Sequence, residues 1–308
     1  MSDIIDYLGE NYYTGWDDKP DLTAEIVASL PEPTIGDTAI GDMPVSDLPK
    51  EVALWKFFSK VAGSPVWKIE NQGSVGSCVS FGTCRAIEAS NVVEIANGEP
   101  ETFKYLCRPI VYGGSRVEAN GGRAAFRGDG STGSLAAKWS TLWGNLPQEK
   151  IAGFDLSIYT PSLCREWGAT GVPNALEPYC KEHPTRACTL VTNVEEAQKA
   201  LANGYGINVC SSQGFNTKRS ADGICAPSGT WNHSMCITGY VHIKDVLYFF
   251  IENSWGAYMG DKNPAPLGAN IATFLAKGDV VNSMLARRDS FAYAGFKGFI
   301  RNDLDWSF

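Results

Sequence analysis

A glycine- and serine-rich loop that runs directly into a helical pattern constrains the fold of this chain more than any other feature. It spans residues 71–81, with the sequence NQGSVGSCVSF. Ser77 is a good N-cap, and the spacing from Cys78 to the stop at Asn97-Gly98 predicts a helix. Cys78 would lie in the first turn, where the helix dipole and free N–H groups favour the thiolate. The alternative is a small buried thiol without a chemical role.

Two segments far downstream supply a candidate partner for this cysteine. They are apolar, strand-like runs at residues 231–240 and 246–256, separated by a turn at residues 242–245. Folding them as an antiparallel hairpin about residue 243 places His233 opposite Asn253. An Asn oxygen that accepts from one imidazole nitrogen fixes the tautomer and leaves the other nitrogen to face a thiol. The sequence therefore predicts a nucleophile, a base and an orienting amide.

These motifs resemble those of the papain-like cysteine peptidases. That family carries a Gln-Gly-x-Cys-Gly-Ser-Cys-Trp loop, an Asn-His or Asp-His pair, and an Asn-Ser-Trp-Gly segment. The resemblance implies that Cys78 is the nucleophile, His233 the base and Asn253 the orienter. It also implies that Gln72 and the Cys78 backbone N–H stabilise the oxyanion, and that Trp255 covers the His–Asn hydrogen bond.

The same resemblance suggests where a substrate binds. Residues 113–133 are rich in glycine and are expected to form a loop, which in the resembling proteins offers backbone groups to an extended peptide. Gly130 and Gly133 are the candidates within it, and Asn232 and Trp255 complete the predicted substrate-binding set. The alternative for the glycine-rich segment is a flexible surface loop.

Three positions depart from the family pattern. Val75 replaces a cysteine that forms a disulfide in the family, and Val79 replaces a tryptophan that packs beside the nucleophile. Met259 stands where a second tryptophan would follow the Asn-Ser-Trp-Gly motif. These substitutions are more typical of bacterial and bacteriophage members than of lysosomal or plant enzymes.

Composition narrows the setting of the chain. A net charge of −8 among 308 residues argues against nucleic-acid and membrane partners. The acidic N-terminus shows no signal peptide, and the nine cysteines cannot all pair within the chain. We therefore predict mostly reduced thiols and a cytoplasmic location, which would be the host cytoplasm or the virion for a bacteriophage protein.

The predicted fold is the α+β, two-lobe papain-like arrangement, with the active site in the groove between the lobes. Residues 1–60 are expected to form an extended arm, 61–190 a helical lobe, and 191–308 a β-rich lobe. Helices are predicted at residues 134–142, 194–202 and 280–287, and a helix or mixed segment at 103–111. The proline-rich arm lacks periodicity. A minor interpretation makes it an autoinhibitory pro-segment, and another lets it clasp a neighbouring subunit.

Three functions fit these patterns. The first is a peptidase that acts on peptide or protein substrates without a cofactor. The second is a virion or assembly protein that keeps the fold and contacts other subunits through its arm. The third is an amidase or acyltransferase with the same triad. A zinc site at Cys180, His183 and Cys188 was a weaker alternative, because no fourth ligand is evident.

Overall fold

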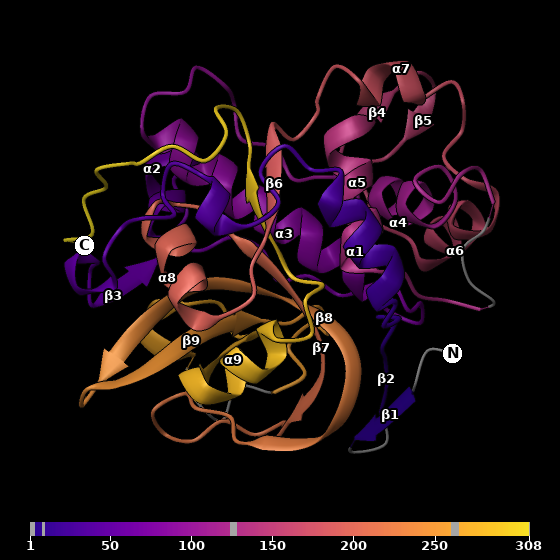
Figure 1. Cartoon of the computed structure of the whole chain (residues 1–308). Coiled ribbons are helices and arrows are strands. Elements are labelled where there is room, and N and C mark those ends of the chain that lie inside the picture. The colour runs from indigo at the N-terminus through magenta and orange to yellow at the C-terminus, as the bar shows by residue number, and fades with distance from the viewer. Residues whose placement is uncertain (1–3, 8–9, 124–127, 260–264, 308) are drawn as a thin grey trace.

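A helical layer and a β-rich layer lie side by side, with α3 (Cys78–Ala96) between them (Figure 1). The computed structural model describes residues 4–7, 10–123, 128–259 and 265–307. Helix α3 contacts helices on one side and strands on the other, and it is buried nearly all round. The predicted α+β, two-lobe class is therefore confirmed.

The N-terminal part of the chain crosses both layers before α3 begins. It forms β1 (Ile4–Tyr7), β2 (Glu10–Tyr13), α1 (Pro20–Ala28), β3 (Glu51–Ala53) and α2 (Phe58–Ala62). Short 3-10 helices lie at Ile35–Asp37, Val45–Asp47 and Leu54–Phe57. Helix α1 packs against the helical layer, whereas β3 pairs with a strand of the main sheet. The arm thus folds onto its own chain.

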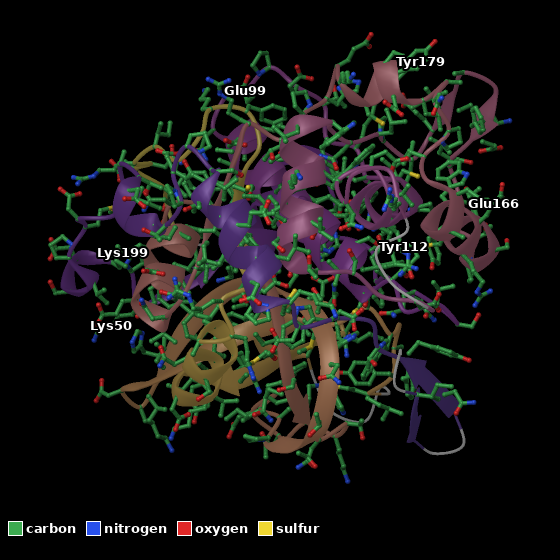
Figure 2. The ribbon with its side chains drawn as sticks, turned by 45° about the vertical axis from the view of Figure 1, so that its right-hand side comes forward. Lys50, Glu99, Tyr112, Glu166, Tyr179 and Lys199 are labelled. Carbon is green, nitrogen blue, oxygen red and sulfur yellow. The ribbon has the colours of Figure 1, made fainter. Side chains whose placement is uncertain are left out.

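The helical layer follows α3. It consists of α4 (Arg108–Arg116), α5 (Gly133–Leu142), the small hairpin β4 (Lys150–Ile151) and β5 (Phe154–Asp155), α6 (Pro161–Thr170) and α7 (Glu177–Cys180). Figure 2 shows Tyr112 among these helices, with Glu166 and Tyr179 at their outer edge. Tyr112 is accordingly buried, whereas Tyr179 is exposed.

The β-rich layer contains one twisted sheet with two covering helices. Its elements are β6 (Ala187–Leu190), α8 (Val194–Ala202), β7 (Ile207–Phe215), β8 (Pro227–Ile243), β9 (Val246–Glu252), a 3-10 turn (Pro266–Gly268), β10 (Thr273–Lys277), α9 (Gly278–Leu285) and β11 (Phe291–Ala294). The strand order is β10-β9-β8-β7-β11-β6, and β3 joins β8 beside this path.

The helix predictions hold where capping signals are local. Helices α5 and α8 match them closely, and α9 begins two residues early. The helix or mixed segment predicted at 103–111 is helical only from Arg108, where α4 begins with Pro109 in its first turn. The loop predicted from residue 113 is also wrong at its start. Gly113 and Gly114 belong to α4, where they allow close packing against Trp167 and Trp139.

The β8–β9 hairpin forms, but its predicted register is wrong. The turn lies at Lys244 and Asp245, so Ile243 pairs with Val246, and a bulge then shifts the ladder between Ile237 and Gly239. Beyond the bulge Cys236 pairs with Glu252. If the same register continued for three more residues, residue 233 would lie opposite residue 255. Residue 253 is then the diagonal neighbour on the same face, which still allows the predicted contact.

Candidate active site

Cys78 starts α3 at the junction of the two layers. Its neighbour Ser77 occupies the N-cap position, but the Ser77 side chain makes no capping bond. Gly82, one turn further along, is where β8 comes close. A Cβ at Gly82 would lie only 2.7 Å from Ser234 Oγ and 2.9 Å from the Met235 carbonyl oxygen. This glycine therefore lets β8 approach α3, which brings the strand that carries His233 to the cysteine.

Burial of the sulfur opposes the thiolate that the sequence predicts at Cys78. Burial raises the pKa of Cys78 to about 12, although the backbone amides of Ser234, Val79 and Gly15 oppose the shift. Burial also lowers the pKa of His233 to about 4, although the hydrogen bond from His233 to Asn253 opposes the shift. Thiol and imidazole are therefore both neutral at pH 7. The loss of hydration on burial raises the pKa of the thiol more than the helix dipole lowers it.

The predicted histidine–asparagine pair is assembled. His233 Nε2 lies 2.8 Å from Asn253 Oδ1. Because that oxygen can only accept, Nε2 carries the proton and Nδ1 is the basic nitrogen. Nδ1 is buried without a hydrogen-bond partner among the described residues, so it can accept a proton. The Trp255 ring covers the pair, with its centre 4.4 Å from that of the imidazole.

The Gln72 amide is held in one orientation by three contacts. Its Oε1 accepts from Ser254 Oγ at 2.7 Å, and its Nε2 donates to the Val75 carbonyl at 2.9 Å. An amide nitrogen has two protons. The second is donated to the carbonyl oxygen of Tyr13, 3.0 Å away. Gln72 therefore points one N–H at a carbonyl oxygen supplied by the N-terminal arm.

The walls of the groove differ partly from the prediction. Asn232 forms one wall, because its carbonyl oxygen accepts from the backbone N–H groups of two arm residues at 3.1 and 3.0 Å. On the opposite wall the backbone pairing is made by Ser131, which was not predicted. The Gly130 N–H donates instead to Tyr112, and the Gly133 N–H donates to Asp289. The N–H groups of the two predicted glycines are therefore already engaged within the fold.

Residues 13–17 lie between these walls. Gly15 and Trp16 donate to the Asn232 carbonyl, the Gly15 carbonyl accepts from the Ser131 N–H at 2.9 Å, and Asp17 donates back to Ser131 at 3.0 Å. The Tyr13 carbonyl receives both the Gln72 amide and, at 2.9 Å, the Trp255 indole N–H. The aperiodic arm sequence does not locate this segment, although the minor pro-segment interpretation places the arm along the groove.

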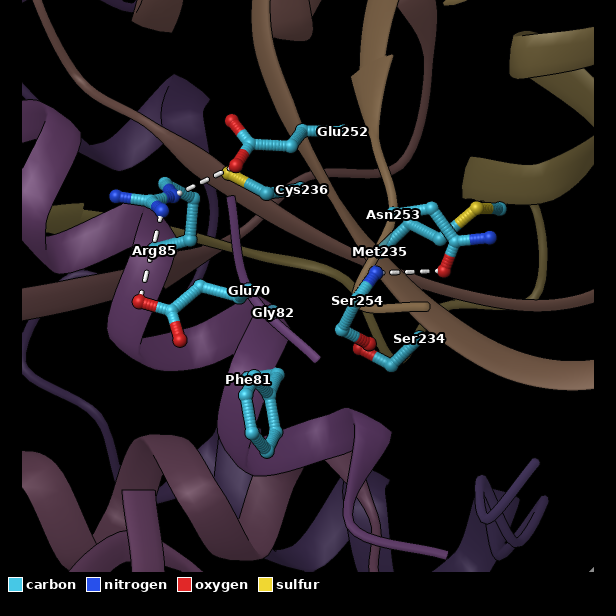
Figure 3. Close-up of a pocket in the computed structure, with 10 residues that line it drawn as sticks. All are labelled: Glu70, Phe81, Gly82, Arg85, Ser234, Met235, Cys236, Glu252, Asn253 and Ser254. Atoms are coloured by element: carbon cyan, nitrogen blue, oxygen red, sulfur yellow. Dashed lines mark hydrogen bonds and ion pairs between the residues drawn. The ribbon is translucent and has the colours of Figure 1, made fainter. Parts of the chain in front are cut away.

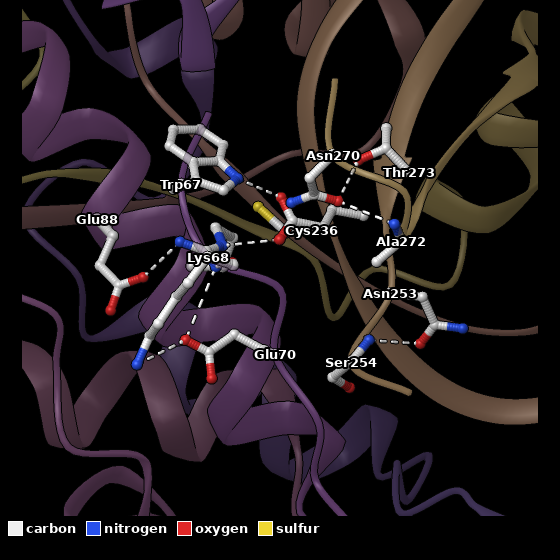
Figure 4. Close-up of polar contacts among 12 residues, drawn as sticks. Trp67, Lys68, Glu70, Glu88, Cys236, Asn253, Ser254, Asn270, Ala272 and Thr273 are labelled. Carbon is white, nitrogen blue, oxygen red and sulfur yellow. Dashed lines mark hydrogen bonds and ion pairs between the residues drawn. The ribbon is translucent and has the colours of Figure 1, made fainter. Parts of the chain in front are cut away.

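A buried ionic cluster supports the site from behind (Figure 4). Arg85 of α3 contacts Glu88 at 2.9 Å and Glu252, the last residue of β9, at 3.0 Å. Arg108 of α4 contacts Glu88 and, at 3.1 Å, Glu70. The two arginines hold the pKa of Glu70 below its ordinary value although burial opposes them. The cluster thus fixes the loop before Gln72 and the strand end before Asn253.

A small cavity of about 10 Å³ lies beside this cluster (Figure 3). Its lining includes Arg85, Glu252, Asn253 and Ser254, but not Cys78. A space of this size is at the lower limit for a single water molecule. It is therefore a feature of the support behind the histidine–asparagine pair and not a binding pocket for a peptide.

Metal and disulfide chemistry receive no support from the side-chain geometry. Within the described ranges, no three histidine, cysteine or acidic side chains are grouped so that they could hold a metal ion. Cys180, His183 and Cys188 therefore do not form the zinc site that was considered. All nine cysteines are buried as free thiols.

In the described part of the chain, no helix combines the length and hydropathy needed to span a membrane.

Two curated sequences are similar to this chain, and no family model matches it. A probable cysteine protease, RD19B of Arabidopsis thaliana, is 26% identical over 243 residues, which are 71% of this chain and 58% of that protein. Mouse pro-cathepsin H is 22% identical over 213 residues, 65% of this chain and 55% of the relative. The chain thus spans little more than half the length of these relatives.

Solved structures show the same fold. Xylellain, a cysteine protease from Xylella fastidiosa, matches with a TM-score of 0.55 at 14% identity, and 92% of each chain is covered. The Carica candamarcensis protease CMS1MS2, solved with E-64, matches with a TM-score of 0.52 at 19% identity over 81% of this chain and all of that one. The chain therefore has the papain-like cysteine protease fold, and its sequence is similar to members of that family.

Proposed function

We propose that the chain is a cysteine endopeptidase in which Cys78 is the nucleophile, His233 the base and Asn253 the orienting amide. The observation that carries the proposal is the 2.8 Å contact between His233 Nε2 and Asn253 Oδ1, which leaves the basic Nδ1 available. Cys78 lies where the strand that carries His233 meets the start of α3. The similarity to cysteine proteases in sequence and fold supports this assignment.

The proposed reaction has two halves. The Cys78 thiol transfers its proton to His233 Nδ1, and the sulfur attacks the carbonyl carbon of the peptide. The carbon–nitrogen bond then breaks as His233 gives this proton to the leaving amine. Water, deprotonated by His233, attacks the resulting thioester, so that the acid product leaves and the thiol is restored. Asn253 keeps the imidazole oriented through both halves.

The developing negative charge would be stabilised by two donors. One is Gln72 Nε2, whose orientation is set by the bonds to Ser254 and Val75. The other is the Cys78 backbone N–H, one of the first N–H groups of α3, which have no partner within a helix. Support for this role comes from the Tyr13 carbonyl, which occupies the position that the Gln72 amide faces.

Hydrolysis of an unstructured, fluorescently labelled protein tests the proposal. It is measured with the intact chain and with Gly15→Ala, in which a Cβ would lie 2.0 Å from the Gly76 carbonyl oxygen and displace the arm. Cys78→Ser should lower the rate by at least about 10³-fold, and Gln72→Ala by about 10²–10³-fold. The matched thiol control, Cys188→Ala, lies in β6 away from the groove and should retain activity. Hydrolysis that survives Cys78→Ser would contradict the proposal.

Transfer of the acyl group to an amine is the alternative that shares this chemistry, and an amine acceptor added to the assay would reveal it through a conjugated product.

The predictions about the source and location of the protein stay predictions: a bacterial or bacteriophage source, a cytoplasmic or virion location, and contacts with other subunits through the arm. So does the division into residues 1–60, 61–190 and 191–308.

A further inference from the structure

A buried asparagine outside the proposed triad joins the elements that carry the nucleophile and the base. Asn208 lies in β7, which packs against α3 and pairs with β8, and its side chain is fully buried. Its Nδ2 donates to the Val79 carbonyl at 3.2 Å and to Thr83 Oγ1 at 2.5 Å, both in α3. Its Oδ1 accepts from Ser234 Oγ of β8 at 2.9 Å and from Cys210 Sγ at 3.1 Å. An amide has two N–H groups and two acceptor lone pairs, so every hydrogen-bonding position of this side chain is used.

Two of these partners stand directly after the proposed catalytic residues. Val79 follows Cys78 in the first turn of α3, and Ser234 follows His233 in β8. The Asn208 amide therefore holds both the helix beside the nucleophile and the strand beside the base. Displacement of a reacting group by about 1 Å can lower a rate about 100-fold, so the spacing that this amide maintains matters for proton transfer from sulfur to imidazole.

Ser234 is bound to α3 in a second way. A Cβ at Gly82 would lie 2.7 Å from Ser234 Oγ, so the hydroxyl rests against bare helix backbone. Burial raises the pKa of Cys78 to about 12, and the backbone N–H of Ser234 makes the largest contribution that opposes this rise. Ser234 thus gives its hydroxyl to Asn208 and its N–H to the nucleophile, and the amide keeps that N–H in place.

We propose that Asn208 is a positioning residue, which acts through Val79 and Ser234 to keep Cys78 and His233 in the geometry that proton transfer between them requires. This inference rests on the proposed function, because that function assigns Cys78 and His233 their roles. An amide that only stabilised the core would affect unfolding but not the reactivity of Cys78.

The test is the pH profile of Cys78 alkylation by iodoacetamide from about pH 5 to 10, read by peptide mass spectrometry. The parent is the Gly15→Ala chain, in which a Cβ would lie 2.0 Å from the Gly76 carbonyl oxygen and displace the arm. Asn208→Leu keeps a similar side-chain volume and removes the bonds to α3 and β8. It should lower labelling near pH 6 by at least about tenfold, since each unit by which the profile moves changes the thiolate fraction tenfold. In hydrolysis, kcat should fall while KM stays nearly unchanged.

Asn145→Leu is the matched control. Asn145 is likewise buried and bonded on both sides of its amide, because Nδ2 donates to Thr185 Oγ1 at 3.0 Å and Oδ1 accepts from Ser140 Oγ at 3.2 Å. It lies beyond the C-terminal end of α5, whose first residues adjoin the groove wall at Ser131. This change should lower stability in urea denaturation but leave Cys78 labelling within about twofold of the parent.

Ser234→Ala keeps the proposal testable if Asn208→Leu does not fold. It removes the hydroxyl that binds Asn208 and retains the backbone N–H. Labelling near pH 6 should fall by about threefold. Combined with Asn208→Leu it should add little, because both changes remove the same contact.

The outcomes separate this proposal from the peptidase proposal. If Asn208→Leu and Asn145→Leu change the profile equally, the positioning role is overturned and the peptidase proposal stands. A shifted profile in a parent that hydrolyses no protein would uphold the positioning role and overturn the peptidase proposal. An ordinary thiol profile in the parent itself would overturn both, since Cys78 would then have no activating partner.

Discussion

The two sides of Cys78 are held by different kinds of contact. Behind the site, two arginines and three acidic side chains form a buried cluster that ties α3, α4 and the end of β9 together: Arg85, Arg108, Glu70, Glu88 and Glu252. Lys68, which is 38% exposed, pairs with Glu70 at the edge of this cluster. In front, residues 13–17 are held by main-chain pairing, by the Gln72 and Trp255 side chains that donate to the Tyr13 carbonyl, and by the carboxylate of Asp289. The ionic cluster, which we call the rear support, joins core residues of both layers, whereas residues 13–17, the front cover, are one short segment.

This difference separates assembly of the site from access to it. Removing a charge from the rear cluster leaves buried partners without compensation, which threatens the whole fold. Opening the front cover exposes only a few residues and resembles a local opening of the native state. The expected effects of substitution therefore fall steeply from the rear of the site to the front and on to the surface.

Arg108→Met should cause the largest loss of stability. Its guanidinium contacts both Glu70 and Glu88, and the substitution would leave these two buried carboxylates with Arg85 as their remaining shared cation in the cluster. We expect a loss of about 3–5 kcal/mol in the free energy of unfolding, measured by urea denaturation. A loss below about 1 kcal/mol would mean that the cluster is not the main support.

Glu94, further along α3, is a buried carboxylate whose pKa shift involves no basic side chain. Burial raises its pKa to about 7, against opposing bonds from the backbone N–H groups of residues 295–297. Since this pKa exceeds the unfolded value, the stabilising contribution is present below about pH 4.5 and is lost as pH rises through about 7. The loss should approach about 3 kcal/mol. In Glu94→Gln that part of the pH dependence should disappear from thermal unfolding curves; an unchanged curve would contradict the assignment.

Gly15→Ala should displace the segment in front of Cys78 without replacing any charged side chain. Its Cβ would collide with the Gly76 carbonyl, so the segment should leave the groove. We expect a stability loss of only about 1–2 kcal/mol, together with faster digestion of residues 10–19 by an added protease. Digestion as slow as in the unaltered chain would show that the loop before Cys78 moves instead of the arm.

Lys104→Ala gives the lower end of the scale. Lys104 pairs with Glu149 at 2.6 Å, but both side chains are about half exposed, at 52% and 42%. The free energy of unfolding should change by less than about 1 kcal/mol, and Cys78 labelling should not change. A larger effect on either measurement would contradict the expectation that an exposed ion pair contributes much less to stability than the buried ion pairs do.

Much of the fold could be predicted because its signals are local. Capping and periodicity locate α3 and α8, and motif order brings Cys78, His233 and Asn253 into one proposed site. The strand register could not be predicted, since a bulge near Gly239 shifts the ladder. The contact that Ser131 makes in the groove could not be predicted, because a backbone N–H group leaves no signature in the residue type.

The arm is the clearest case of information that a local pattern does not contain. Its position depends on a hydrogen bond between Trp16 and Asp289, which are 273 positions apart. The pKa of Cys78 likewise depends on tertiary packing, because burial of the thiol raises it, while the Gly15 backbone of the arm opposes the shift. A helix N-terminus predicts a thiolate only where solvent or a charged partner can reach the sulfur.

The most direct measurement is the pH profile of Cys78 alkylation by iodoacetamide in the Gly15→Ala chain, in which the arm is displaced, followed from about pH 5 to 10 against the same chain with His233→Ala. We predict fast labelling already near pH 6, well below the ordinary thiol pKa of about 8.5, and its loss in the His233→Ala chain. Labelling that follows an ordinary thiol titration in both chains would show that His233 does not activate Cys78, and would contradict the proposed catalytic centre.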